Sequence, residues 1–319
     1  MVKIRIVKIK SLRRGVLSLV TLGLILGFGS PLGTQASSLK DTSKDAVNIT
    51  LDDIKLEPGQ ADINQLPEEL KEKVQDRIKV MDEYFLQLGE LENKIANKKA
   101  ELNNRINVSQ NLNELNALQE EYKYIYNNSE IIAGITKVEI EATIDLQSAY
   151  TNVTVPKPTL YYDSDSKMYS LTGTWNWNTN YPDGSVGGLE GFGLRIEQEQ
   201  ITVFQHDLYT WDNMGASATR YHPSVSAQVN SRGIGMKWQD SWRNLSPATY
   251  SAFSGRGHIY FKFYNGTPYG KSLNTASVYA HTWSSTSLTS LSAGLTSFGF
   301  GWKNESHNWS RENYNVVSF

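Results

Sequence analysis

Apolar side chains recur at alternating steps of four and three residues through the first half of the chain. Stepping in this way from Leu70 to Arg105 gives one mixed seam and one seam that is apolar throughout, formed by Val74, Met81, Leu88, Ile95 and Leu102. One apolar seam predicts a long amphipathic helix, whereas a coiled coil requires both seams to be apolar. The start is marked by Leu66-Pro67-Glu68-Glu69, where a first-turn proline loses no hydrogen bond and two acids face the positive helix end.

The helical pattern is interrupted at residues 107–111, whose sequence Asn-Val-Ser-Gln-Asn is rich in residues that favour caps and turns. Asn111 and Glu114 then have the spacing of a capping box, and apolar residues continue at helical spacing from Leu112 to Ile125. We therefore expect a helical hairpin over residues 66–128, with one helix of about 60 residues as the alternative. Such an arm serves as a spacer or as a coiled-coil element for self-association.

After Ser129 the pattern changes to short runs of β-branched and aromatic residues separated by Pro, Asp, Ser and Gly, which is typical of strands. Asp163 to Lys167 has the composition of a hairpin turn. Many short strands with turn signals, and no repeat of fixed length, predict a β-sandwich or a barrel. The runs cover residues 136–146, 153–155, 160–162, 168–177, 193–196, 200–204, 234–238, 258–264, 277–283 and 298–302.

These patterns divide the chain into parts of different architecture. We expect an α+β multidomain protein in which an N-terminal helical hairpin or coiled-coil arm precedes an aromatic-rich, all-β sandwich or barrel domain. The predicted parts are an export signal (1–36), a flexible acidic lead-in (37–65), the helical arm (66–128), a linker or edge strands (129–154) and the β-domain (155–319). Residues 155–319 are expected to fold alone, since about 160 residues suffice for one well-buried core.

The first 36 residues have the composition of a secretory signal peptide. Six basic residues precede an apolar run, Gly15–Gly29, and Thr34-Gln35-Ala36 supplies small residues before a cleavage site. A retained membrane anchor is the alternative, but about 15 apolar residues fall short of the roughly 20 that a spanning helix needs. We therefore expect a secreted bacterial protein cleaved after Ala36, with a leader that resembles those of Gram-positive bacteria.

Composition excludes several classes of function. The chain has no cysteine, which rules out disulfides, thiol catalysis and thiolate metal sites. Six of its 31 basic residues lie in the leader, so cleavage leaves 25 basic against 33 acidic residues, a net charge of about −8. No basic block remains, which argues against nucleic-acid binding and against simple attraction to anionic lipid.

Candidate binding residues come from aromatic clusters in the second half of the chain, where all eight tryptophans and all five histidines lie. On a strand, Trp175 and Trp177 share one face and form an apolar surface suited to a sugar ring, a lipid tail or a packed core. We predict an exposed aromatic platform with Trp175, Trp177 and Trp211 as the principal ligand contacts, and core packing is the alternative. The full predicted ligand-binding set is Trp175, Trp177, Tyr181, Trp211, Asp212, Trp238, Asp240 and Trp242.

Catalytic and metal signatures are weak. The histidines lack His-x-x-x-His and His-Glu-x-x-His spacing, and Asp163, Asp165 and Lys167 do not fit a calcium loop. Ser185 lies in a glycine-rich stretch without the following helix of a nucleophile elbow. A glycosidase needs two carboxylates roughly 5 to 9.5 Å apart, and sequence does not pair the candidates Glu190, Glu197, Glu199, Asp207, Asp212 and Asp240. We therefore predict no catalytic residue, no metal site and no cofactor.

Three functions fit these observations. The first is a non-catalytic β-domain that binds an extracellular ligand, a glycan or another cell-envelope component, through carboxylates and indoles together. The second is a secreted membrane-active toxin or bacteriocin-like protein, because Ser284 to Gly294, followed by alternating glycine and aromatic residues, resembles the strand chemistry of pore-forming proteins. A membrane is a partner only in that case. The third is a polysaccharide or cell-wall hydrolase.

Overall fold

The computed structural model describes residues 49–103, 105, 107–138, 152–177, 187–214, 219–220, 226–243 and 249–319. The predicted export signal with its cleavage site, and Tyr181 of the predicted binding set, lie outside these residues. Within the described part, no helix is both long enough and apolar enough to span a membrane.

The helical hairpin is confirmed, with α1 at Glu68–Asn103 and α2 at Val108–Asn127, followed by the short α3 at Ser129–Ala133. Arg105 and Asn107 both have positive φ, 57° and 40°, and these left-handed residues reverse the chain. The second helix begins three residues before Asn111, so Asn111 does not cap it. Instead Asn111 is buried and its Oδ1 accepts a hydrogen bond from Lys98 Nζ of α1 at 3.2 Å.

Sheet A is the larger of two sheets, with the strand order β1-β7-β13-β5-β4-β2, while β3 pairs with β5 and β8 with β7. The predicted turn joins β4 to β5 as an antiparallel hairpin, and Lys167 there has φ 62°. The strands are β1 (Gly59–Gln60), β2 (Ile135–Lys137), β3 (Val153–Thr154), β4 (Thr159–Asp163), β5 (Met168–Trp177), β7 (Ile201–Trp211), β8 (Thr219–Arg220) and β13 (Ser254–Phe263).

Sheet B is antiparallel, with the order β17-β14-β6-β10-β9. Its strands are β6 (Leu189–Ile196), β9 (Ser226–Asn230), β10 (Gly233–Gln239), β14 (Ser272–Thr282) and β17 (Asn308–Ser318). Two further antiparallel pairs belong to neither sheet: β11 (Trp242–Arg243) with β12 (Thr249–Tyr250), and β15 (Ser287–Ala293) with β16 (Phe298–Lys303). Because A and B are separate sheets packed on a shared apolar core, the domain is a sandwich, and the barrel alternative is wrong.

Part of the predicted flexible lead-in is ordered against sheet A. Leu51, in the short helical turn η1 (Leu51–Asp53), is fully buried, and Lys262 Nζ of β13 donates to the carbonyls of Leu51 and Ile54 at 2.7 Å each. Strand β1 pairs in parallel with β7, and η2 (Ile63–Gln65) leads into α1. The sequence lacked periodicity here because these elements are too short to show any.

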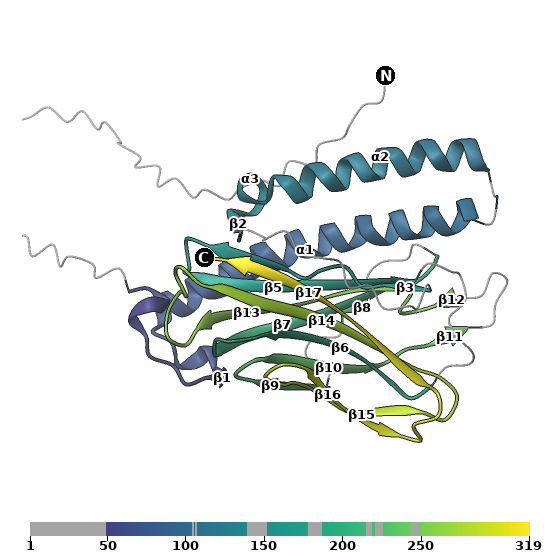
Figure 1. Cartoon of the computed structure of the whole chain (residues 1–319). Helices are drawn as coiled ribbons and strands as arrows, with labels where there is room; N and C mark the ends of the chain where they lie inside the picture. Colours follow the sequence, from purple (N-terminus) through teal and green to yellow (C-terminus); the bar gives the residue numbers. More distant parts are fainter. Residues whose placement is uncertain are drawn as a thin grey trace, which may run out of the picture. The chain divides into compact units, whose positions relative to one another are not determined.

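Helix α1 covers the outer face of sheet A, while α2 packs on α1 (Figure 1). The apolar stripe of α1 forms a buried cluster with residues of sheet A. The cluster contains Val74, Ile78, Met81, Phe85 and Leu88 of the helix and Tyr161, Met168, Phe204 and Tyr260 of the strands. Gly89 allows the closest approach, since a Cβ there would lie 2.2 Å from Cη2 of Trp211. The helical hairpin is thus part of the core, and residues Asn48–Phe319 form one unit.

Polar contacts also cross this helix–sheet interface. Arg77 pairs with Asp163 (2.8 Å), Asp82 with His258 (2.9 Å) and Glu92 with Arg256 (2.8 Å). Buried charges need such partners, because an unpaired charge in a core costs several kcal/mol. The apolar contacts and the ion pairs together fix where α1 lies on sheet A and which of its residues face which strands.

The β15–β16 hairpin lies on the outer face of sheet B (Figure 1). Its register puts Leu288 opposite Trp302, Leu291 opposite Phe300 and Ala293 opposite Phe298. Leu288, Leu291, Ala293 and Phe298 are buried against Ala276, Val278 and Ala280 of β14. The amphipathic pattern that suggested a membrane-active segment is accounted for by packing within the protein.

Candidate functional site

The structure places the predicted aromatic platform in the interior. Trp175 and Trp177 do share one face of β5, but that face lies between the two sheets, where they are 0 % and 1 % exposed. Trp238 lies in the same core at 3 % exposed, and Trp211, at 2 %, is covered by α1 at Gly89. The expectation of an exposed platform is wrong for Trp175, Trp177 and Trp211, because sequence alternation defines a common face but not what covers that face.

Most of the predicted residues nevertheless converge on one region of the sandwich. Trp175 is stacked on Tyr279 (centroids 5.0 Å apart) and on Trp238 (5.2 Å), while Trp177 meets Tyr250 edge to face at 5.9 Å. Trp242 contacts the ring of Tyr250 at 6.3 Å and is only half-buried.

The neighbour of Asp212, Asn213, reaches the same region, since its Oδ1 accepts a hydrogen bond from the Tyr250 backbone nitrogen at 2.9 Å. Trp211 lies on the opposite side of sheet A and does not join this group. Asp212 and Trp242 are thus the half-buried members of the predicted set at this end, with the buried tryptophans behind them.

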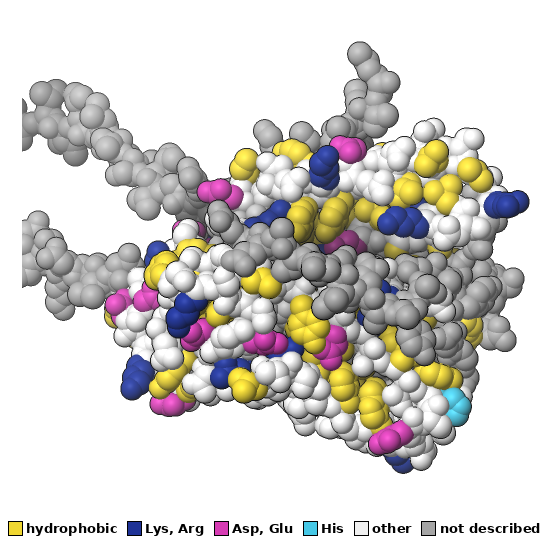
Figure 2. Space-filling model, in the orientation of Figure 1, with side chains coloured by type: hydrophobic (Ala, Val, Ile, Leu, Met, Phe, Trp, Pro, Cys, Tyr) yellow, Lys and Arg dark blue, Asp and Glu magenta, His cyan; other side chains and the backbone are white. Residues whose placement is uncertain are grey.

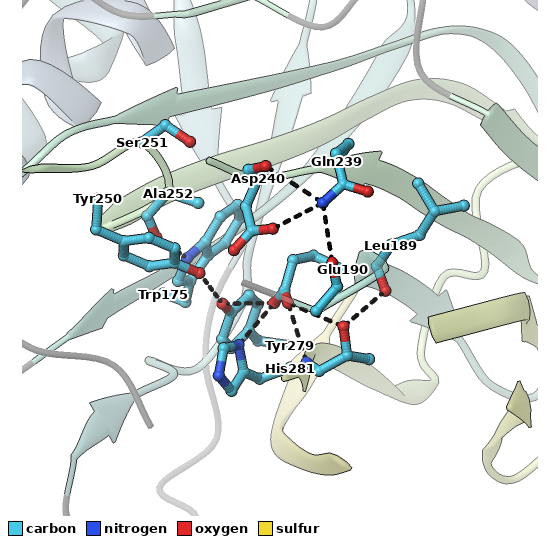
Figure 3. A network of polar contacts seen from close by, with 12 residues as sticks. Trp175, Leu189, Glu190, Gln239, Asp240, Tyr250, Ser251, Ala252, Tyr279 and His281 are labelled. Carbon is cyan, nitrogen blue, oxygen red and sulfur yellow. Dashed lines mark hydrogen bonds and ion pairs between the residues drawn. The ribbon is translucent and has the colours of Figure 1, made fainter. Parts of the chain in front are cut away.

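A buried carboxylate, that of Glu190, organises the polar side of this region (Figure 3). Its Oε2 accepts from the Tyr279 hydroxyl at 2.8 Å and from His281 Nδ1 at 3.0 Å, and its Oε1 accepts from the Thr282 backbone nitrogen at 2.9 Å. Glu190 is on β6 and its partners are on β14, so the contacts span two paired strands. With its donors supplied from a rigid sheet, Glu190 fixes the positions of Tyr279 and His281.

Asp240 follows β10 and points into the same network (Figure 3). It is 4 % exposed, and Gln239 Nε2 donates to its Oδ1 at 3.1 Å. Burial raises the pKa of Asp240 to about 7, and repulsion from the Glu190 carboxylate adds to this, while His281 and a hydrogen bond from Tyr250 act in the opposite direction. Asp240 is therefore a carboxyl group that keeps its proton at pH values well above those at which an ordinary aspartate ionises.

Stability is expected to fall as pH rises through the range in which Asp240 ionises. The folded state holds this proton up to about pH 7, whereas an aspartate in the unfolded chain releases it near 3.9, so between these values the unfolded state binds fewer protons. The free energy of unfolding should drop by about 2 to 4 kcal/mol from pH 4 to pH 7 from this group alone. Denaturant unfolding at pH 5.0, 6.0 and 7.5 measures the slope.

The matched variant for this experiment is Asp240→Asn, which imitates the neutral carboxyl and should remove most of the slope. Asp212→Asn, a half-buried aspartate at the same end, should leave the slope unchanged. Equal slopes in wild type and Asp240→Asn would show that Asp240 is ionised in the folded protein.

Sequence reasoning missed the residues at the centre of this network, Glu190, Tyr279 and His281. Glu190 was one of six candidate carboxylates, and His281 looked isolated because its partners are distant along the chain. One signal was present: Tyr279, His281 and Trp283 alternate along a predicted strand, which puts three aromatic rings on one face.

A second cluster with metal-ligand chemistry lies beneath α1, where atoms of Asp82, Asp207 and His258 lie within 4.8 Å of one another. His258 Nε2 is 2.9 Å from Asp82 and 3.9 Å from Asp207. The Tyr209 hydroxyl donates to Asp82 at 2.7 Å, and Gln205 donates to Asp207 at 2.8 Å. The direct hydrogen bond between His258 and Asp82, with the additional donors to both carboxylates, fits a polar contact that fixes α1 on sheet A, like the other ion pairs at this interface.

Charged side chains on the face seen in Figure 2 are interspersed, with basic and acidic groups of the described residues set singly among neutral ones. No large basic area is visible among the described residues on that face. That nucleic acid is not a partner stays a prediction from the charge counts.

Comparisons with known proteins add little to this geometry. No protein-family model and no curated protein matches the chain. Among solved structures, one similar chain is that of AvmM, described as catalysing macrocyclization in alchivemycin A biosynthesis; it shares 9% sequence identity, and the match covers 43% of this chain and 80% of that chain at a TM-score of 0.20. A TM-score this low gives no information about the fold or the function of this chain.

Proposed function

We propose that this chain is a secreted, non-catalytic glycan-binding protein of the cell envelope or its surroundings. The ligand contacts the end of the sandwich at Trp242 and Asp240. The observation that carries the proposal is that the half-buried indole of Trp242 and the nearly buried carboxyl group of Asp240, two residues away in the sequence, both interact with Tyr250. An indole covers the C–H face of a sugar ring, and carboxyl and amide groups bind its hydroxyls.

The rigidity of this region supports binding without rearrangement. Tyr250 contacts Trp242 with its ring and Tyr279 with its hydroxyl, 3.3 Å away, and Tyr279 in turn donates to Glu190. Groups that are already ordered lose little entropy on binding, which favours affinity. Gln239, exposed and bonded to the Gly187 carbonyl at 3.3 Å, adds an amide at the rim.

Sedimentation with insoluble polysaccharides tests the proposal. We expect the mature chain to be retained by at least one of purified peptidoglycan, chitin and cellulose, and Trp242→Ala to weaken retention at least tenfold, about 1.4 kcal/mol or more. The measurement is the bound fraction as a function of polysaccharide concentration, with melting temperature as a check of folding.

Trp302→Ala is the matched control, since Trp302 is also a half-buried tryptophan but lies on β16 of the β15–β16 hairpin. Its retention should equal that of wild type. No retention on any of the three polysaccharides, or equal loss in both variants, would refute binding at Trp242.

Hydrolysis of the same glycan is a second candidate, favoured by one observation. Asp240 and Glu190 are neighbouring carboxyls in different environments, and such pairs often divide acid and base roles. Glu190, fully buried and bonded to four groups, is less suited to meet a substrate. Release of reducing ends by wild type but not by Asp240→Asn would establish hydrolysis and displace the non-catalytic proposal.

The membrane-active alternative and self-association through residues 66–128 stay predictions. The apolar side of the β15–β16 hairpin is used against sheet B, and the apolar stripe of α1 is used against sheet A. A membrane-inserting β15–β16 hairpin, or self-association through the α1 stripe, would therefore require that surface to be released first. Export and cleavage after Ala36 also remain predictions, decided by N-terminal sequencing of protein from culture supernatant.

A further inference from the structure

We propose that Trp283 is a second aromatic contact of this site, and that the ligand is accordingly a glycan chain several sugars long, not a single sugar. This inference rests on the proposed function. It adds a residue outside the predicted set and a substrate class, linear oligo- or polysaccharide, that Trp242 alone does not imply.

Trp283 directly follows β14, and the side chains on the inner face of this strand become more exposed toward Trp283. Tyr279 is 0 % exposed, His281 is 2 % exposed, and Trp283 is half-buried, so exposure begins at Trp283. Alternate residues of a strand lie roughly 6.6 Å apart on one face. The His281 and Trp283 rings are stacked, with centroids 5.8 Å apart and planes 19° from parallel. Trp283 therefore continues the aromatic row that Tyr279 and His281 begin.

The indole of Trp283 is held in place by its surroundings. Its backbone nitrogen donates to the His307 carbonyl at 3.1 Å, and the two rings meet edge to face at 5.6 Å. Its carbonyl accepts from the Thr286 nitrogen at 3.3 Å, and Ser284 between them has a left-handed φ of 59°. Backbone strain of this kind persists where surrounding structure enforces it, often at binding sites.

Trp242 and Trp283 each contact a ring of the buried network, Trp242 that of Tyr250 and Trp283 that of His281. The route from one to the other runs through the rings of Tyr250, Tyr279 and His281, and among the described aromatic pairs none joins the two indoles directly. Two half-buried indoles at the two ends of this series of ring contacts offer two stacking positions, which fit a chain of linked sugars.

Chain-length dependence of binding tests the inference. The probes are oligosaccharides of one, two, four and six units with the linkage of whichever polysaccharide retains the protein, titrated by calorimetry. We expect affinity to rise with length for wild type. Trp283→Ala should lower the affinity for the hexamer about tenfold, as for a moderate hot spot, and change that for the monomer less than twofold.

Two variants keep the result interpretable. Trp283→Tyr preserves an aromatic face and should keep most of the hexamer affinity, and Trp302→Ala should behave as wild type. Affinity independent of length, or a Trp283→Ala protein that is folded and binds the hexamer as wild type does, would overturn the inference while Trp242-dependent binding stands. Failure of every polysaccharide to retain the wild-type chain would overturn the proposed function, and the inference with it.

Discussion

Phe85→Asp is expected to abolish cooperative folding of the chain. Phe85 is fully buried between α1 and sheet A, where its ring contacts Tyr161 at 5.3 Å and His258 at 5.2 Å. A carboxylate placed there loses the burial of an aromatic ring, worth about 3 to 5 kcal/mol, and adds an unpaired buried charge. Together these approach the whole stability of a domain, about 5 to 15 kcal/mol. Thermal unfolding followed by near-UV circular dichroism measures the effect.

Val80→Asp is the matched control, because Val80 lies on the same helix and is 37% exposed. It should change stability by less than about 0.5 kcal/mol, as for an ordinary surface substitution. A shortened chain that starts at Asn152 gives a second measurement, since it keeps the whole of β3–β17 but lacks the helices. Cooperative melting of Phe85→Asp, or of the shortened chain with an unchanged near-UV spectrum, would restore the expectation that the β-domain folds alone.

Trp177→Ala is expected to destabilise the protein by about 3 to 5 kcal/mol, the range for a large aromatic removed from a core. Trp177 is 1 % exposed and packs edge to face against Tyr250, Tyr279 and Trp309. Its removal leaves a cavity between the sheets, because the surrounding rings are held by their other aromatic contacts and close the space only in part. Chemical denaturation with tryptophan fluorescence, supported by far-UV circular dichroism, measures the change.

Trp242→Ala provides the contrast, since Trp242 is half-buried and should cost no more than about 1 kcal/mol of stability. The two variants separate a core tryptophan from a binding tryptophan. A Trp177→Ala protein that keeps its stability but loses polysaccharide retention would place the ligand contact at Trp177, as the sequence first suggested.

Trp177 is buried and Trp242 is half-buried, and this difference shows what a local sequence pattern can predict. Alternation along β5 correctly put Trp175 and Trp177 on one face, because side chains of a strand alternate regardless of what surrounds them. Whether that face meets water or another sheet depends on the pairing of β6, β10 and β14 into sheet B. Those pairings join residues far apart in sequence, and a local pattern does not encode them.

The helical hairpin shows the same limit: its helices were predicted from local pattern, but their packing was not. The period and the start signal predicted α1, and the break followed by renewed helical spacing predicted a second helix, because helical hydrogen bonds are local. The second helix begins at Val108, inside the expected break. The docking of α1 on sheet A was not predicted. An amphipathic stripe predicts that a helix packs on an apolar surface, but not on which one. The contacts of Gly89 with Trp211 and of Glu92 with Arg256, which identify sheet A as that surface, form only in the folded chain.

By itself, the sequence determined the classes of element, the hairpin turn at Asp163 to Lys167, the absence of disulfides and the aromatic character of the second half. These follow from backbone propensity, side-chain periodicity and composition, all of which act over short distances. The tertiary structure alone decided which tryptophans are core and that Glu190, Asp240, Tyr279 and His281 form one network. The physical reason is that burial and carboxyl pairing depend on contacts between strands far apart in the sequence, such as Glu190 with His281 and Trp177 with Trp309. These contacts exist only when both sheets have formed and packed on one another.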